Sequence, residues 1–330
     1  MESMLPVIFV FIIGLALLLY VVLDGYDLGT GLLLPLATED EKDIMIASIG
    51  PFWDANETWI VLGIGVLLIA FPEAYGDILT KLYLPVTIML LGLILRGVAF
   101  DFRVKAGVKK KPMWNKLFFF GSLTASCSQG WMLGHYITGL EDNFINYAFS
   151  LLIAFTLPAL YLMLGSAWLL IKTEGELFHK AARWGRYSFW PMVIGLGLIS
   201  VATPLVSEVI AARWFVLPNI IGLMPIPGVS LLLLVVIYRL LSDGNKFTEA
   251  NPWIVFFGLV LICLLAATGL AYSIFPDIII GRMTIWEAAS ATASLQFVLV
   301  GVVITLPMIL CYNVMVYRIF RGKATHLSYD

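Results

Sequence analysis

Ionisable side chains inside apolar stretches are the residues of this sequence whose types and spacing could do chemistry. They are five acids and one arginine, all within the first third of the chain: Asp24, Asp27, Asp54, Glu57, Arg96 and Asp101. A charge at the centre of a membrane helix costs about 2.5–3.5 kcal/mol on insertion scales, so each such residue needs a partner or a function. Acids in membrane segments commonly belong to proton relays. The pattern therefore favours a proton path through these six residues.

Structural interpretations compete with this one. Asp54 precedes Glu57 by three residues, which fits a capping box at the start of a helix. A cap alone would account for both acids. Arg96 could serve only to neutralise one of the acids in an ion pair, and Asp101 could simply flank the bilayer. These alternatives stay open at the level of the sequence.

Histidine is scarce, and its scarcity argues against a cofactor in this chain. There are three histidines: His135, His179 and His326. A six-coordinate b-type haem needs two axial ligands from facing helices, commonly two histidines or a histidine and a methionine. Only His135 lies within an apolar stretch, and no metal-ligand spacing surrounds it. We therefore expect neither a metal nor a firmly bound cofactor, and, without any nucleotide-binding or hydrolase motif, no catalysis by this chain alone.

The composition shows which elements must position these residues. Hydrophobic residues make up 61% of the chain and charged residues only 13%, about half the share in soluble proteins, and the mean hydropathy is +0.95. A soluble globule is excluded, and a net charge of −2 without a basic face argues against nucleic-acid binding. The apolar runs are continuous rather than alternating, which predicts helices and not a β-barrel.

Nine stretches are long enough to cross the bilayer, since about 20 apolar residues are needed. They cover residues 5–27, 54–71, 78–100, 117–139, 147–171, 189–210, 220–241, 253–275 and 291–317. We predict an all-α integral membrane fold of nine transmembrane helices, arranged as two four-helix bundles plus one additional helix. Residues 1–330 form a single transmembrane domain.

Lysine and arginine predict the orientation. Sixteen of them fall in the connections on one side and at the C-terminus, whereas the other side holds only Lys81, Arg213 and Arg282. The positive-inside rule then places the C-terminus in the cytoplasm and the N-terminus outside. With this orientation, the six ionisable residues of the first three spans lie at the cytoplasmic ends of their helices.

Several motifs in a fixed order point to a family. They lie at residues 23–29 (LDGYDLG), 50–59 (GPFWDANETW), 96–103 (RGVAFDFR), 172–177 (KTEGEL), 284–290 (TIWEAAS) and 317–322 (YRIFRG). With these motifs the sequence resembles subunit II of the cytochrome bd-type quinol oxidases over essentially the whole chain. The form WDANETW is similar to the branch described as cyanide-insensitive.

The resemblance implies a role within a complex. Such oxidases pass electrons from quinol through haem b and haem d to oxygen in the bacterial cytoplasmic (inner) membrane. The haems belong to subunit I, and the haem-free subunit II stabilises it and conducts cytoplasmic protons toward the oxygen-reducing site. Quinol oxidation thereby generates proton motive force without pumping. A small single-helix accessory subunit and a structural quinone or lipid are also compatible with the resemblance.

The family's motifs assign roles to individual residues. Asp54 matches the proton-path acid, Asp27 the second acid of its motif beside Asp24, and Arg96 and Asp101 the third-span motif. Trp59 matches a tryptophan near the proposed oxygen route. Glu57 departs from members that carry Gln at this position, which puts a titrating role for it in doubt.

Two other functions stay open beside the oxidase. A proton-coupled secondary transporter would carry charges at the midplane on broken helices. A purely structural membrane partner would use all its acids as caps and ion pairs. A coloured complex with a haem-bearing chain would favour the oxidase, and solute accumulation by the reconstituted chain would favour the transporter.

Overall fold

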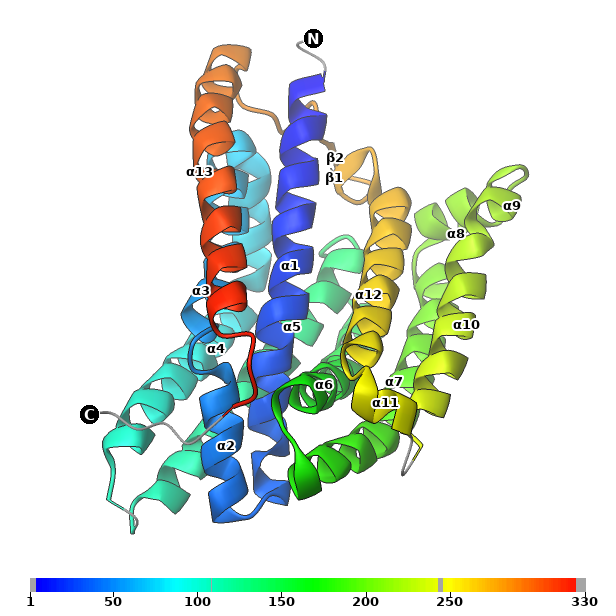
Figure 1. Cartoon of the computed structure of the whole chain (residues 1–330). Helices are drawn as coiled ribbons and strands as arrows, with labels where there is room; N and C mark the ends of the chain where they lie inside the picture. The colour runs from blue at the N-terminus through cyan, green and yellow to red at the C-terminus, as the bar shows by residue number, and fades with distance from the viewer. Residues whose placement is uncertain (1–3, 108, 243–245, 325–330) are drawn as a thin grey trace.

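The computed structural model describes residues 4–107, 109–242 and 246–324, and the described chain is almost entirely helical (Figure 1). His326 lies outside the described residues. The helices are α1 Leu5–Leu33, α2 Glu39–Ile49, α3 Trp53–Ala70, α4 Pro72–Lys105, α5 Lys111–Ile137, α6 Phe144–Lys172, α7 Gly175–Val206, α8 Glu208–Trp214, α9 Asn219–Leu223, α10 Pro225–Leu240, α11 Lys246–Ala250, α12 Trp253–Ile274 and α13 Thr292–Ile319, with a short 3-10 helix at Leu34–Leu36. Long helices are expected in lipid, because every backbone polar group must bond within its own segment.

Eight helical segments of the described chain are long and apolar enough to span a membrane. They correspond to every predicted stretch except residues 117–139, which lie in α5. This helix of 27 residues packs between α4 and α6 and carries polar residues on its buried side: Ser122, Ser126, Ser128 and Gln129. An interior helix does not need a fully apolar surface, which explains why α5 is the least apolar of the predicted spans.

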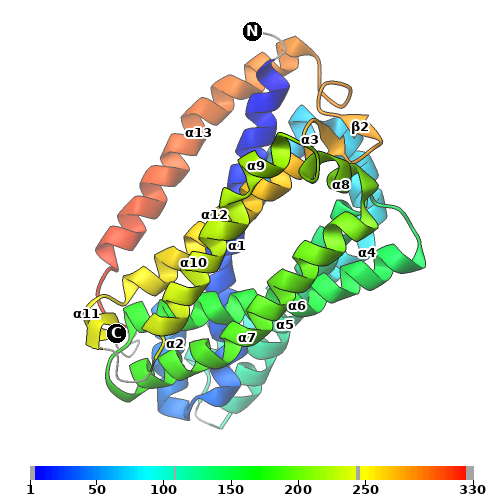
Figure 2. The same cartoon turned by 90° about the vertical axis from the view of Figure 1, so that its right-hand side faces the viewer.

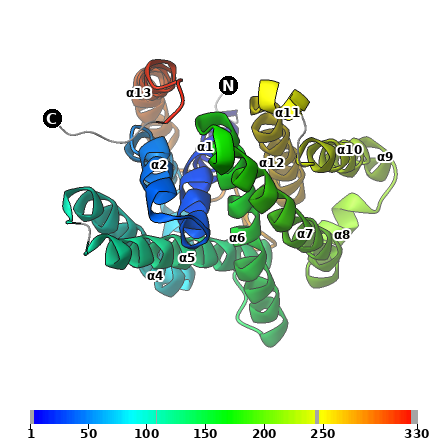
Figure 3. The same ribbon diagram turned by 60° about the horizontal axis from the view of Figure 1, so that its bottom comes forward.

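Helix α1 lies in the middle of the molecule, in contact with α3, α5, α6 and α12 (Figure 3). Its closest approach is to α6, where a Cβ at Gly29 would stand 1.7 Å from the carbonyl oxygen of Tyr161 and a Cβ at Gly165 would stand 2.4 Å from the carbonyl carbon of Gly29. Only glycine permits such a backbone contact between membrane helices. This close crossing fixes the position of α1 along α6, and therefore the positions of Asp24 and Asp27.

Helix α2 was not among the predicted spans, and its charges explain why. It lies near the end of α1 away from the N-terminus (Figure 3) and begins with a capping box between Thr38 and Glu41. Asp43 on α2 forms ion pairs with Arg103 of α4 (2.8 Å) and Lys111 of α5 (2.9 Å). These pairs tie α2 to α4, which carries the third-span motif, and to the start of α5.

The side of the molecule that faces the viewer in Figure 2 contains α7, α8, α9, α10 and α12. Helix α7 begins at Gly175, fourteen residues before the predicted span, because the segment expected as a cytoplasmic connection is helical. The predicted span at 220–241 is divided between α9 and α10, where prolines crowd its start.

A small hairpin of β1 (Asp277–Ile279) and β2 (Met283–Thr284) precedes α13. Thr284 and Glu287 bond reciprocally as in a capping box, but this pair closes a turn and α13 begins only at Thr292. Helix α13 contacts α1 and α3 along one side and otherwise stands apart from the bundle (Figure 2).

Candidate functional site

Arg96 is the centre of the ionisable group. Its guanidinium comes from α4, is 1% exposed, and lies 2.6 Å from the carboxylate of Asp24 on α1. It also forms an ion pair and a hydrogen bond with Glu57 on α3. Glu57 is only partly buried, whereas Asp24 is fully buried. The ion pair expected for Arg96 is therefore present, and it joins three helices at one depth.

Asp27 lies one helical turn from Asp24 and completes what we call the carboxylate–arginine cluster: Asp24, Asp27, Glu57 and Arg96. Asp27 is fully buried, and its Oδ2 accepts a hydrogen bond of 2.7 Å from the side-chain amide of Asn56. Its Oδ1 has no hydrogen-bond partner within the described residues, and Asp24 is held by its ion pair with Arg96 beside the Tyr20 hydroxyl.

A narrow crevice adjoins the cluster. Asp27 and Arg96 form its polar side, and Ile49, Trp53, Phe100 and Phe118 form its apolar side. The empty space in it is about 190 Å³, but no part is wide enough for a water-sized sphere. A proton that reaches Asp27 by this side therefore needs a side-chain movement that widens the crevice.

Asp54 and Asp101 lie outside the buried cluster. Both side chains are exposed, Asp54 in the first turn of α3 and Asp101 near the end of α4, and they are close enough to interact electrostatically. Arg96 is also within electrostatic range of Asp54. The structure thus divides the six predicted residues into a buried group of four and an exposed pair.

The predicted capping box at Asp54 and Glu57 is wrong. Helix α3 begins at Trp53 with Phe52 at the N-cap position, and no side chain caps it. Asp54 is already within the helix, and the Glu57 carboxylate is drawn to Arg96 instead. An ion pair to a buried guanidinium is stronger than a bond to one exposed N–H, so the tertiary partner wins over the local signal.

Trp59 is 1% exposed and packs against Ala16 and Tyr20 of α1. Its indole N–H is buried without a hydrogen-bond partner among the described residues. It lies in the same helix as Asp54 and Glu57, farther from the start of α3 than either acid.

Sequence reasoning missed the neutral polar residues around the cluster. Asn56 and Tyr26 surround Asp27, and Tyr317 reaches them from α13. On the other side Tyr161 and Gln129 form a buried chain with Tyr20, in which the Gln129 amide donates to the Tyr20 hydroxyl at 2.8 Å. The signal in the sequence is a set of tyrosines and amides at the positions next to acids, which is too common to single out.

The arrangement has a clear electrostatic consequence. With all three acids ionised, the carboxylates would carry a charge of −3, and the single guanidinium would reduce it only to a net −2. An unbalanced charge in a buried site is so unfavourable that a carboxylate there takes up a proton and becomes neutral instead. The cluster is thus suited to bind and release a proton.

The two described histidines pair with acids outside this cluster. His135 on α5 is buried, with its Nε2 3.5 Å from Asp142, and His179 on α7 has its Nε2 3.9 Å from Glu249. Within the described ranges, no three His, Cys, Asp or Glu residues come together in a way that could hold a metal ion.

Comparison with known proteins identifies the family and the fold. The family described as cytochrome bd terminal oxidase subunit II matches residues 5–320. The chain belongs to this family. Cytochrome bd ubiquinol oxidase subunit 2 of Bacillus subtilis is 27% identical over 92% of each chain, and cytochrome bd-I ubiquinol oxidase subunit 2 of Escherichia coli is 27% identical over 95% of this chain and 93% of that protein.

A solved structure has the same fold. The bd oxidase from Geobacillus thermodenitrificans matches with a TM-score of 0.78 over 96% of this chain and 98% of that chain, at 16% identity. The curated relatives are subunits of a terminal oxidoreductase complex. A subunit II of a bd oxidase implies a subunit I as its partner and a membrane as its location, and the apolar helices agree with the membrane location.

Proposed function

We propose that this chain is the haem-free subunit II of a quinol:oxygen oxidoreductase and conducts cytoplasmic protons toward the oxygen-reducing site of subunit I. The carboxylate–arginine cluster is the observation that carries the proposal. It brings three acids and a single arginine together at one depth, with carboxylate oxygens that lack hydrogen-bond partners among the described residues. A purely structural site would balance its buried charges.

In the proposed path Asp54 is the first relay. It is exposed, so water can reach it, and Asp101 beside it helps to keep a proton at this surface. Glu57 lies three residues farther along α3 on the neighbouring helix position. It contacts Arg96, which holds the buried acids together and tunes their affinity for the proton that Asp27 receives.

The orientation is part of the proposal. The nine crossings, including α5, place the N-terminus outside and the C-terminus in the cytoplasm, with the helices in two four-helix bundles plus α13. Quinol releases its protons outside while oxygen reduction consumes protons from the cytoplasm. Each charge separated against 100 mV stores about 2.3 kcal/mol, which is why the uptake side needs a guided path.

The haem b and haem d groups belong to subunit I in this proposal, and this chain stabilises that subunit. Its own residues supply no electron-transfer step. Trp59, buried beside α1, is placed for the proposed oxygen route, and a quinone or lipid and a small accessory subunit complete the complex.

Asp54→Asn tests the proposal, because it removes the titratable proton and, since Asp54 caps no helix, leaves the local structure unchanged. We expect quinol-dependent oxygen uptake by the purified complex to fall about tenfold or more, the scale on which proton-transfer groups act. Haem content and subunit ratio should stay at the level of the unmodified complex.

Asp40→Asn is the matched control, because Asp40 is an exposed acid of α2 outside the cluster. It should retain full oxygen uptake. If Asp54→Asn and Asp27→Asn both retain full oxygen uptake and proton release, the acids have only structural roles and the proton path is refuted.

A further inference from the structure

A ring of hydrogen bonds joins α1, α3 and α13 beside Asp27. The Tyr317 hydroxyl donates to the carbonyl oxygen of the Asn56 side chain at 3.0 Å, so its hydrogen is already used. The 2.6 Å bond between Tyr26 and Tyr317 must then run from the Tyr26 hydroxyl to the Tyr317 oxygen. The Asn56 amide nitrogen donates back to Tyr26 at 2.8 Å and closes the ring; its two hydrogens are shared among Tyr26, Asp27 and the more distant Leu23 carbonyl oxygen at 3.2 Å. Such rings are cooperative, because each bond polarises the next.

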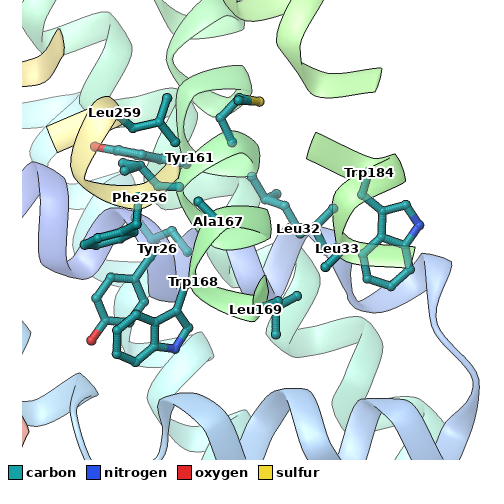
Figure 4. Packing of buried hydrophobic residues seen from close by; sticks show 14 of the residues in the cluster. Tyr26, Leu32, Leu33, Tyr161, Ala167, Trp168, Leu169, Trp184, Phe256 and Leu259 are labelled. Atoms are coloured by element: carbon teal, nitrogen blue, oxygen red, sulfur yellow. The ribbon is translucent and has the colours of Figure 1, made fainter. Parts of the chain in front are cut away.

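The position of the ring is fixed from two sides. Tyr26 is fully buried and stacks against Trp168 of α6, with 4.1 Å between ring centroids (Figure 4). Tyr317 is held because the end of α13 is clasped to the end of α6. Lys172 donates to the carbonyls of Phe320 and Gly322, while the Ala324 amide donates to the carbonyl of Lys172.

The ring has one contact with the cluster, and it is to Asp27. The Asn56 amide nitrogen also donates to Asp27 Oδ2 at 2.7 Å, whereas Oδ1 is buried and has no partner among the described residues. A carboxylate oxygen that accepts an N–H hydrogen bond is less basic than one that accepts none. Protonation of Asp27 therefore favours Oδ1 over Oδ2. The charged groups that face Asp27 are Asp24 on its own helix, Glu57 from α3 and Arg96 from α4, and the hydroxyls of Tyr26 and Tyr317 face it from α1 and α13.

We propose that Tyr317, Asn56 and Tyr26 form a positioning ring that holds Asp27 through Oδ2 and leaves Oδ1 as the proton-carrying atom. The inference rests on the proposed function, in which Asp27 carries a proton. It assigns α13 a part in proton transfer, although α13 contributes no acid to the cluster.

Two variants test the ring in the assembled, haem-bearing complex. Asn56→Leu removes the donor to Asp27 while keeping an isosteric side chain, and Tyr317→Phe removes only the hydroxyl. Loss of a hydrogen bond to a carboxylate favours its protonated form, so the pH of half-maximal proton uptake should rise, by about one unit for Asn56→Leu, a tenfold change in proton affinity. Tyr317→Phe should raise the same pH by less, which corresponds to a change in proton affinity of about two- to threefold.

Infrared spectroscopy of the same complexes gives a readout that a merely structural role would not move. The band of the protonated Asp27 carboxyl, identified by its loss in Asp27→Asn, should shift in both variants. Tyr312→Phe is the control, because Tyr312 is an exposed tyrosine of the same helix, and it should change neither the pH profile nor the band.

The outcomes separate the two proposals. If Asp27→Asn lowers proton uptake but Asn56→Leu and Tyr317→Phe leave the pH profile and the band unchanged, the ring is overturned and the proton path stands. If Asp27→Asn itself has no effect, the proton path fails first. Should Asn56→Leu assemble poorly, as judged by haem content, Tyr317→Phe and Tyr26→Phe decide the question alone.

Discussion

At the scale of single residues, Arg96 decides how the acids are used. The sequence predicts that it lies near them, because span lengths and the positive-inside rule set the depth of every residue. It cannot predict which acids Arg96 selects, since Asp24, Asp27, Asp54, Glu57 and Asp101 all share that depth. The choice depends on helix rotation and crossing, which bring Asp24 and Glu57 to the guanidinium and leave Asp54 and Asp101 exposed.

The same reason explains the wrong capping box and the missed ring. A capping box is a local pattern, and it fails at Asp54 because a buried cation attracts Glu57 from another helix. Asn56 gives no signal of its own in the sequence. Its role comes from contacts with residues 30 positions before it and 261 positions after it.

Arg96→Gln should destabilise the protein strongly. The substitution leaves Asp24 buried without its cation, and breaking a buried pair by removing one partner costs about 3–5 kcal/mol. We expect a clear fall in the Tm of the detergent-solubilised complex, measured by intrinsic tryptophan fluorescence. Lys42→Gln, which breaks an exposed pair with Glu39, should change the Tm little, because exposed pairs contribute about 0–1 kcal/mol. Equal Tm values for Arg96→Gln and Lys42→Gln would mean that the Asp24 charge needs no partner.

At the scale of elements, the membrane helices follow from the sequence and the parts outside them do not. The predicted span at 147–171 lies inside α6, and the one at 253–275 ends one residue beyond α12, because hydropathy reports bilayer thickness directly. Helix α2 mixes charged and apolar residues, so hydropathy does not detect it, and only the capping box between Thr38 and Glu41 marks its start. Helix α7 extends well beyond its apolar part, since a helix does not have to end where the lipid ends.

Helix α2 should loosen in acid. Partial burial alone would raise the pKa of Asp43, but the ammonium of Lys111 and the guanidinium of Arg103 outweigh it and hold the pKa below its ordinary value of 3.8. For Glu41, burial likewise raises the pKa, but Lys180 and the Thr38 cap lower it below 4.5. A lowered folded pKa gives stability that is present above the unfolded pKa and is lost as the pH falls through the folded value.

Hydrogen exchange of the α2 amides, corrected for the intrinsic effect of pH, measures this loosening. Protection should hold at pH 6 and fall below about pH 4, where carboxylates begin to titrate. Asp43→Asn should weaken protection at pH 6 and flatten its dependence on pH. Protection of α2 that persists unchanged to pH 3 would show that these ion pairs do not dock the helix.

At the scale of the whole molecule, several distant segments of the chain hold the cluster in place. The α1–α6 crossing sets the height of the acids, α2 covers the end of α1, and the clasp between α6 and the C-terminal segment brings Tyr317 to Asp27. Three separate parts of the chain therefore converge on one carboxyl. A proton path built this way depends on the assembly of the whole bundle, and no single helix carries it.

The orientation of the chain in the membrane decides on which side that carboxyl lies, and the two ends of α5 report it. If α5 spans the membrane, its two ends face opposite sides, whereas a re-entrant α5 would return both ends to one side. Single cysteines at Gly107 and Glu141, both exposed and flanking α5, distinguish the two, in a background where Cys127, Cys263 and Cys311 are replaced by serine. A membrane-impermeant maleimide should label Glu141→Cys in right-side-out vesicles and Gly107→Cys only in inside-out vesicles. Labelling of Gly107→Cys in right-side-out vesicles would place the cluster end of α4 outside and refute the uptake of cytoplasmic protons, and labelling of both positions from the same side would show that α5 does not cross the membrane.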